Sequence, residues 1–299
     1  MGGRVHRVGG RERLRKRGGR RSPFIIRPRD LLYVDPASSA ADDDGFGFDA
    51  AVRDRVVPFF RFLFERYWRV EVEGIENVPD TGAALLVANH SGAIPFDGAM
   101  IVTAVFVRHQ RQRSVRFLYD RFVDGMPGVG TFYRRVGGVP ASYANTARLV
   151  AREHLVMTFP EGLAGVAKPF SERYRLQPFS SSFVRLSLNH RVPIVPVAVV
   201  GAEEAYPLVA KLEDAGRLLG VPYIPVTPFF PFFGVAGALP LPTKWYISFG
   251  KPIELYAPPR EGALNPALRP PRDLARRVRR RIATMVTRLR KRRQSIFFG

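Results

Sequence analysis

Short apolar runs alternate with amphipathic segments along most of this chain. The runs are rich in valine, leucine and isoleucine and are bounded by glycine, proline or asparagine, which is typical of buried strands. Strands that alternate with helices predict an α/β fold, with a mixed sheet flanked by helices. Strands are expected at 70–73, 83–88, 115–119, 138–140, 155–159, 192–200 and 245–249, and helices at 48–68, 97–107, 129–136, 144–153, 180–190 and 202–219.

Three further patterns each allow two interpretations. Aromatic residues surround more than one face of the helix at 48–68, which either packs on the domain or lies partly in a lipid interface. Apolar residues recur at helical spacing over 274–289 with arginines between them, so this helix either contacts a membrane or packs on its own domain with a solvated basic face. The phenylalanines of 229–233 favour a buried cover over the sheet, with lipid docking or an acyl groove as the other interpretation, and 296–298 is expected to add an apolar foot.

The formal charge of +21 belongs to the two ends of the chain. Residues 1–28 hold ten lysines and arginines against one acidic residue, a net +9, and residues 260–299 hold thirteen against two, a net +11. The stretch between them, 29–259, is nearly neutral at +1. Basic arms either attract nucleic acid or anionic membranes, or are solvated tails that reflect background arginine usage. The arms lack interleaved aromatic residues or a groove-reading module, which favours a membrane surface over nucleic acid.

This charge pattern divides the chain into three parts. We expect a basic, disordered arm and linker at 1–47, a catalytic domain at 48–258, and a basic amphipathic helix at 259–299. No signal peptide is predicted. The longest uncharged window, 218–243, contains six prolines, which disfavours a spanning helix. These features predict a peripheral or monotopic protein at the cytoplasmic face of a membrane.

The candidate chemistry lies where two apolar strands end. His90 follows the strand at 83–88, and Glu161 follows the strand at 155–159. In open α/β sheets this end of the strands is where ligands gather. An imidazole titrates near neutral pH and suits the role of a general base. Asp97, seven positions after His90, is placed to orient the ring, either across two helical turns or through a loop that contains Pro95.

Four sequence blocks strengthen this interpretation, because they occur in the order of a known family. The chain resembles the glycerophospholipid acyltransferase superfamily, which includes the lysophosphatidate and monoacylglycerol-type acyltransferases, over roughly residues 66–258. The resemblance implies the glycerol-3-phosphate acyltransferase-like form of the α/β fold. The blocks are Asn89-His90 with Asp97, Arg135-Val136-Gly137-Gly138-Val139-Pro140, Phe159-Pro160-Glu161-Gly162, and Val192-Pro193-Ile194-Val195-Pro196-Val197.

This resemblance implies acyl transfer from acyl-CoA, or from an acyl carrier protein, to the hydroxyl of a lysophospholipid or glycerolipid. His90 would deprotonate the hydroxyl and Asp97 would orient His90. The chemistry requires no metal and no cofactor other than the acyl donor as co-substrate. The residues expected to bind substrate are Asn89, Arg134, Arg135, Glu161, Gly162 and Lys168.

Two departures from the family pattern leave the acceptor open. The common spacing is His-x4-Asp, whereas this chain has His-x6-Asp, and branches that resemble the monoacylglycerol and diacylglycerol acyltransferases begin with a similar Asn-His-Ser-Gly. Arginines that lysophosphatidate enzymes place after the second and third blocks are missing here. Nearby cations, at 134, 135 and 168, either replace them or form structural ion pairs. A neutral acceptor, or a catalytically silent lipid-binding relative, is therefore the alternative.

Overall fold

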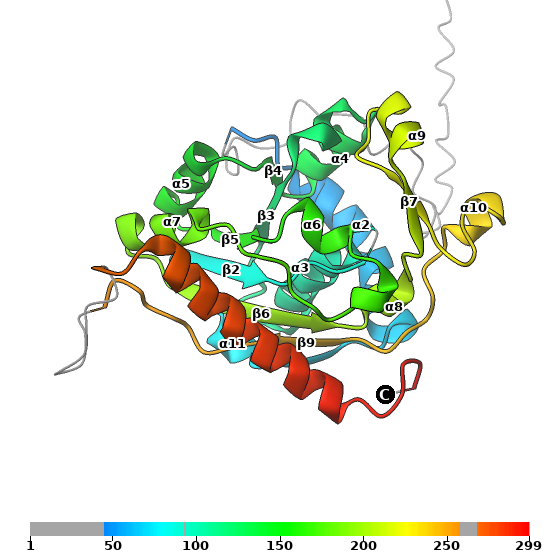
Figure 1. The fold of residues 1–299 in the computed structure, drawn as a ribbon. Helices are drawn as coiled ribbons and strands as arrows, with labels where there is room; N and C mark the ends of the chain where they lie inside the picture. The colour runs from blue at the N-terminus through cyan, green and yellow to red at the C-terminus, as the bar shows by residue number, and fades with distance from the viewer. Residues whose placement is uncertain (1–44, 93, 258–267, 299) are drawn as a thin grey trace, which may run out of the picture.

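The computed structural model describes residues 45–92, 94–257 and 268–298. Most of the predicted basic arm at 1–47, and the first part of the 259–299 segment, lie outside the described residues. The described chain forms a layered α/β fold, as the apolar pattern predicts, with helices on both faces of one large sheet (Figure 1).

The central sheet has seven strands in the order β1-β9-β6-β2-β5-β3-β4. The five strands from β6 to β4 run parallel, whereas β9 pairs antiparallel with β6 and parallel with β1. The sheet is therefore mixed. Its strands are β1 (Glu71–Glu73), β2 (Ala84–Ala88), β3 (Val115–Tyr119), β4 (Gly138–Pro140), β5 (Leu155–Thr158), β6 (Ile194–Val200) and β9 (Tyr246–Phe249).

Alternate residues of the central strands enter two separate cores. In β2, Leu86 belongs to one core and its neighbours Leu85 and Val87 belong to the other. This follows from the two-residue period of a strand, which sends successive side chains to opposite faces. Because both faces are covered, the central strands are apolar throughout, which explains the unbroken runs in the sequence.

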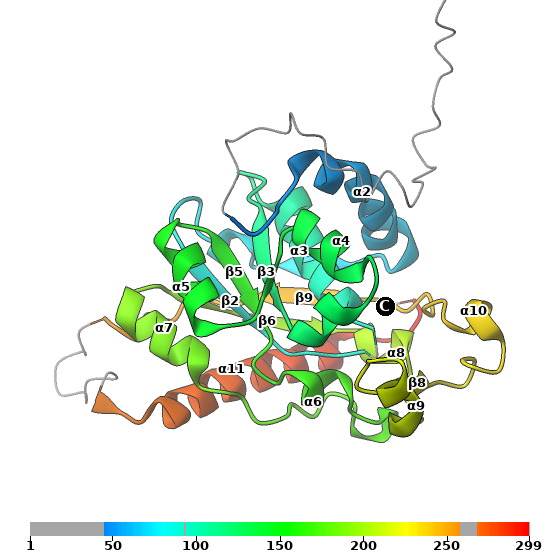
Figure 2. The same cartoon turned by 90° about the horizontal axis from the view of Figure 1, so that it is seen from above.

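Different helices cover the two faces of the sheet (Figure 2). One face packs against α2 (Ala50–Phe62), the π-helical segment η1 (Leu63–Tyr67) and α3 (Phe96–Arg108). The other packs against α5 (Tyr143–Ala151), α7 (Ser182–His190) and α11 (Pro271–Arg292). The remaining helical elements are η2 (Ile75–Asn77), η3 (Arg121–Gly125), α4 (Val129–Arg135), α6 (Leu163–Val166), η4 (Phe170–Glu172), α8 (Ala202–Ala205), α9 (Glu213–Leu218) and α10 (Gly234–Gly237).

The cationic helix α11 lies against the sheet with its apolar residues buried. Its apolar face is continuous with the second core, and its arginines face outward. The packed interpretation of this helix therefore holds, and its apolar face is not available to lipid. The buried residues of α11 are Leu274, Ala275, Val278, Ile282, Met285, Val286 and Leu289.

The helix expected at 202–219 is wrong in its middle part. The chain forms α8 (Ala202–Ala205), leaves the helix near Pro207 and enters a two-stranded hairpin of β7 (Ala210–Leu212) and β8 (Ile224–Val226), with α9 between them. Proline has no N–H for the helix interior, which accounts for the interruption. The cover predicted at 229–233 is also wrong, because three of its four phenylalanines are exposed.

The length and hydropathy of the helices bear on the expected monotopic arrangement. Among the residues described in the structure, no helix is both long enough and apolar enough to span a bilayer. The segment at 218–243 forms short elements separated by prolines.

Candidate active site

His90 and Asp97 meet at the carboxyl end of β2. His90 Nδ1 lies 2.7 Å from Asp97 Oδ2, and the aspartate is fully buried. His90 precedes α3, whereas Asp97 lies in the first turn of this helix. Of the two arrangements that the sequence allows, the loop therefore brings the pair together.

The surroundings of Asp97 suit an ionised carboxylate. Its Oδ2 also accepts the backbone N–H of Ser91 at 2.8 Å, and its Oδ1 accepts the N–H of Gly98 at 2.8 Å. The positive end of the α3 dipole favours the negative charge as well. A carboxylate beside Nδ1 holds the proton on that nitrogen, so Nε2 of His90 carries the lone pair. No hydrogen-bond partner of Nε2 is found among the residues that the structure covers.

Glu161 supports the backbone of His90 from the neighbouring strand end. It follows β5, and its Oε1 accepts the His90 N–H at 2.9 Å while its Oε2 accepts the Gln177 N–H at 2.5 Å. Phe159, two residues earlier, stacks on the His90 ring with centroids 4.0 Å apart and planes at 13°. The Phe-Pro-Glu-Gly turn therefore fixes both the backbone and the ring plane of His90.

Two glycines shape the segment after Glu161. Gly162 turns the chain into α6 with φ +56°, a conformation that favours glycine. Gly165 lies so close to the site that a Cβ there would stand 2.7 Å from His90 Cβ and 2.9 Å from Glu161 Cβ. The sequence gives no role to Gly165, although only the absence of a side chain permits this approach.

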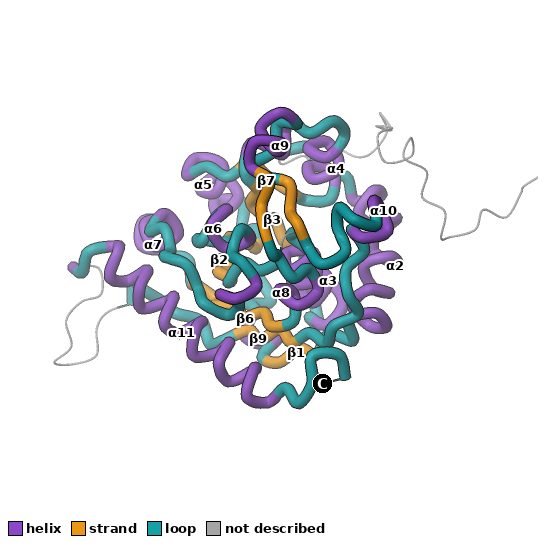
Figure 3. The backbone as a smooth tube through the Cα atoms, turned by 45° about the vertical axis from the view of Figure 1, so that its right-hand side comes forward, coloured by secondary structure: helices purple, strands orange, loops and turns teal. Residues whose placement is uncertain are grey.

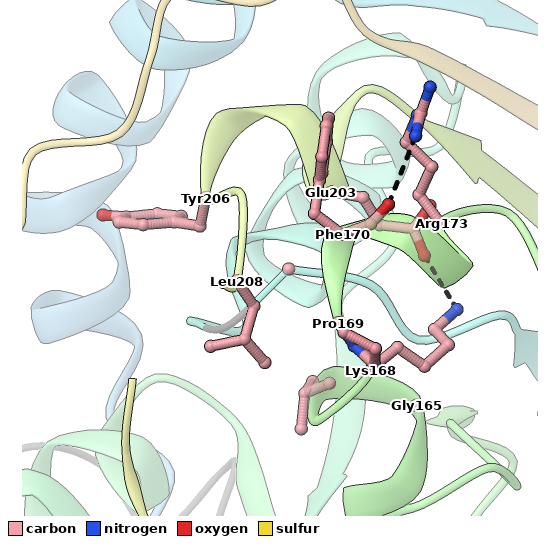
Figure 4. A pocket seen from close by; sticks show the side chains of 10 residues that line it. Gly165, Lys168, Pro169, Phe170, Arg173, Glu203, Tyr206 and Leu208 are labelled. Carbon is pink, nitrogen blue, oxygen red and sulfur yellow. Dashed lines mark hydrogen bonds and ion pairs between the residues drawn. The ribbon is translucent and has the colours of Figure 1, made fainter. Parts of the chain in front are cut away.

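A small pocket opens beside the His90 turn (Figure 4). Gly92 and Gly165 bring it against the His90 segment, and Phe170, Tyr206 and Leu208 supply apolar and aromatic surface. The figure shows Lys168 and Glu203 meeting at its wall, where Lys168 Nζ lies 2.7 Å from Glu203 Oε1. Arg173 also lines the pocket.

All three cations that the sequence offers as substrate ligands are paired with a carboxylate. Arg134 bonds Asp124. Arg135 is buried, and its Nη2 lies 2.7 Å from Oδ2 of Asp49 just before α2. Lys168 pairs with Glu203. Each of the three cations therefore forms an ion pair within the protein, which is the second of the two roles that the sequence allows, and each has a partner without a substrate.

Asn89 braces the end of the sheet. Its Nδ2 donates to the Val199 carbonyl at 3.1 Å, and its Oδ1 accepts the Val199 N–H at 2.8 Å. The side chain thereby extends the pairing of β2 with β6 beyond the last residue of β2. The carbonyl oxygen and one N–H of the buried amide therefore hold the end of β2 against β6, and the predicted role of Asn89 in substrate binding stays a prediction.

Burial dominates the electrostatics of the two glutamates. Burial raises the pKa of Glu161, and the nearby Lys168 together with the N–H groups of Gln177 and His90 oppose this shift. Burial likewise raises the pKa of Glu203, against the attraction of Lys168. Lys168 therefore acts electrostatically on both carboxylates of the site.

The site offers one histidine placed to act as a base. Within the described ranges, no group of three or more histidine, aspartate or glutamate side chains is placed to hold a metal ion. A histidine oriented by a buried carboxylate, with its second nitrogen open, can take a proton from a hydroxyl or thiol.

Comparison with known proteins gives one family and several relatives. The family model "Acyltransferase" matches residues 69–200, which include the dyad and Glu161. An uncharacterized protein of Mycobacterium leprae is 44% identical over 258 residues, covering 86% of this chain and 70% of that protein. Phytyl ester synthase 2 of Arabidopsis thaliana is 28% identical over 61% of this chain and 29% of its own length.

A solved structure also matches the chain. It is the 1-acyl-sn-glycerophosphate (LPA) acyltransferase of Thermotoga maritima, with a TM-score of 0.48 and 17% identity over 80% of this chain and 82% of that chain.

Proposed function

This chain belongs to the acyltransferase family, and from this premise we propose that it transfers a fatty acyl group from a thioester to the hydroxyl of a lipid acceptor. The donor would be acyl-CoA or an acyl carrier protein. The observation that carries the proposal is the 2.7 Å contact between His90 Nδ1 and the buried Asp97, which leaves Nε2 to act as the base.

The reaction needs one proton carrier. His90 Nε2 accepts the hydroxyl proton as the acceptor oxygen attacks the thioester carbonyl carbon. The C–S bond then breaks, and the departing thiolate takes the proton from the imidazolium, so the products are an ester and a free thiol. Asp97 stabilises the imidazolium while it exists. Glu161 and Phe159 hold the ring in place.

The paired cations favour an acceptor without a phosphate group. A phosphate at Arg134, Arg135 or Lys168 would compete with the carboxylate already paired with that cation, and two of these pairs are buried. Phytyl ester synthase 2 is by its name an enzyme that makes the ester of an alcohol. We therefore place mono- or diacylglycerol-like lipids and long-chain alcohols first among the acceptors.

Arg173 keeps a second candidate open. It lines the pocket beside His90, and no ion pair to a carboxylate is found for it among the described residues. A lysophospholipid acceptor would place its phosphate there.

Mass spectrometry of lipids after incubation with mixed acyl-CoAs tests both candidates. The acceptor panel contains monoacylglycerol, diacylglycerol, a long-chain alcohol and lysophosphatidate. We expect a new neutral ester from the wild type, and a loss of about 10²–10⁴-fold in rate for His90→Ala and Asp97→Asn. His190→Ala, at an exposed position on α7, is the matched control and should keep its rate.

The results of this assay distinguish among the possible acceptors, the role of the dyad and the activity itself. Turnover of lysophosphatidate alone would reverse the order of the acceptors. Full activity in folded His90→Ala would reject the dyad. A folded wild type that is inactive on the whole panel would reject acyl transfer and leave a lipid-binding relative.

A further inference from the structure

In the part of the chain that the structure describes, the exposed phenylalanines are confined to three segments. Two lie on α2, three lie around α10, and two lie after α11; among the residues described, every exposed phenylalanine is on one of these. The most prominent pair is Phe232, 75% exposed, and Phe233, 67% exposed. We call this set the aromatic rim: Phe59, Phe62, Phe229, Phe232, Phe233, Phe297 and Phe298.

Hydrogen bonds hold the three segments together although they are far apart in sequence. Tyr67, at the end of η1, donates its hydroxyl to the Pro240 carbonyl at 2.5 Å, and Arg69 donates to the carbonyl of Phe297. The Lys244 N–H donates to the carbonyl of Ile296 at 2.7 Å. Figure 3 shows α2, α10 and the C-terminal residues along the same side of the molecule. The three segments that carry the rim therefore lie next to one another in the fold (Figure 3).

Within the described chain, cations without a carboxylate partner accompany the α2 part of the rim. Arg61 and Arg66 are exposed on α2 and η1, and neither has an ion pair with a carboxylate among the described residues. Phenylalanines flanked by arginines are the composition of elements that insert shallowly into an anionic membrane interface. A solvated surface alone gives no reason to gather seven exposed phenylalanines.

The rim is connected to the pocket beside His90. Tyr206 lines this pocket, and its hydroxyl donates to the Ala238 carbonyl at 2.7 Å, immediately after α10. Leu208 also lines the pocket and accepts the Phe170 N–H at 2.8 Å. The segment that carries Phe232 and Phe233 is thus attached to the pocket wall.

We propose that the aromatic rim docks this protein onto a bilayer that contains anionic lipids, and that the acceptor lipid reaches the pocket from that bilayer. Only the delivery of the acceptor lipid to the pocket rests on the proposed function. Docking requires only the rim and its arginines. The arrangement also gives the exposed phenylalanines a partner whose charge complements the adjacent cations.

Flotation with phosphatidylcholine vesicles, with and without phosphatidylglycerol, tests the docking. Phe232→Ser/Phe233→Ser should lower the partition onto anionic vesicles at least about tenfold, because the variant no longer has the two aromatic side chains that would be buried in the bilayer. The matched control is Leu218→Ser/Leu219→Ser on and after α9, where residues 87% and 69% exposed lie outside the rim. The control should float like the wild type.

Different results would overturn the docking, its lipid partner or the proposed function. Equal flotation of the Phe232/Phe233 variant and the wild type, or an equal loss in the Leu218/Leu219 control, would refute docking through the rim. Light scattering identifies the other possible occupant, because a dimer that the Phe232/Phe233 variant dissociates would show that a second copy covers the rim. Flotation needs no turnover, so an inactive enzyme that still floats would reject the proposed function and keep the docking.

A water-soluble donor and acceptor separate docking from chemistry. The Phe232/Phe233 variant should turn over short-chain substrates at the wild-type rate and lose activity only on acceptors held in vesicles. Loss on both kinds of substrate, with flotation unchanged, would place these residues in the site and overturn the docking role.

Discussion

A methyl group at Gly165 probes how closely α6 packs against the base. The added Cβ would stand 2.7 Å from His90 Cβ, 2.9 Å from Glu161 Cβ and 3.2 Å from the His90 carbonyl oxygen. Carbon atoms prefer separations of about 3.5–4.0 Å, so the shortest contact is about 0.8 Å too close. Three neighbours cannot all yield, because the His90 N–H is bonded to Glu161 and its ring to Asp97. The His90 turn must move.

The magnitude follows from that displacement. A shift of about 1 Å in a catalytic group can cost about 100-fold in rate. Overpacking typically costs about 1–3 kcal/mol in stability. Part of this is offset, since alanine is favoured over glycine by about 1 kcal/mol inside a helix. We therefore expect Gly165→Ala to lower kcat/KM about 100-fold and to lower the free energy of unfolding by no more than about 2 kcal/mol.

Release of free thiol from acyl-CoA, followed with a thiol-reactive dye, measures the rate, and urea unfolding measures the stability. Gly125→Ala is the matched control, because a Cβ there meets no atom within 4 Å. It should leave both quantities unchanged. If folded Gly165→Ala keeps its kcat/KM within twofold, the packing of α6 does not position the base, and the reasoning fails.

Three further substitutions test the buried polar groups and the last helix. Lys168→Met leaves Glu203 buried without its ion-pair partner, and burial already raises the pKa of Glu203. The stability of this variant should therefore be highest in acid and fall as pH rises through that raised pKa, to about 3–5 kcal/mol below the wild type at neutral pH. Lys168→Met/Glu203→Leu should recover the stability, and a loss that does not depend on pH would contradict the reasoning. Glu161→Gln turns an NH₂ group toward a backbone N–H donor and should cost about 1–3 kcal/mol in urea unfolding, whereas a more stable variant would argue against the two acceptor bonds. Ile282→Ala should cost about 2–5 kcal/mol, and an unchanged unfolding midpoint would mean that α11 is not part of the cooperative unit.

The positions of the central strands and of the base follow from local pattern, whereas the order of the strands in the sheet does not. Central strands buried on both faces are unbroken apolar runs, so 83–88 and 155–159 can be located, and with them the residues that follow. The contact of His90 with Asp97 follows less directly. The spacing of seven fits both a helix and a loop, and only the start of α3 at Phe96 decides between them.

Long-range pairing could not be predicted from the sequence. The partner of Arg135 is Asp49, at the other end of an 86-residue separation, and the partner of Lys168 is Glu203 on a different strand end. Nothing near a cation in sequence indicates which carboxylate the fold will bring to it. The interruption of 202–219 did have a local signal, since Pro207 lies inside the expected helix.

The position of α11 has a consequence for how the protein is made. This helix covers the part of the second face that β6 forms, including Ile194, Ala198 and Val200, yet it begins about 70 residues after β6 ends. At a synthesis rate of about 5–20 residues per second, this part of the face waits for about 4–14 seconds for α11, although α5 and α7 are already made. During this interval the nascent chain presents valine and isoleucine side chains to the solvent. We expect chaperones that bind nascent chains to be in demand at this stage of translation. Ile282→Ala should therefore lower the yield of folded protein in cells by a larger factor than its loss of equilibrium stability alone would give.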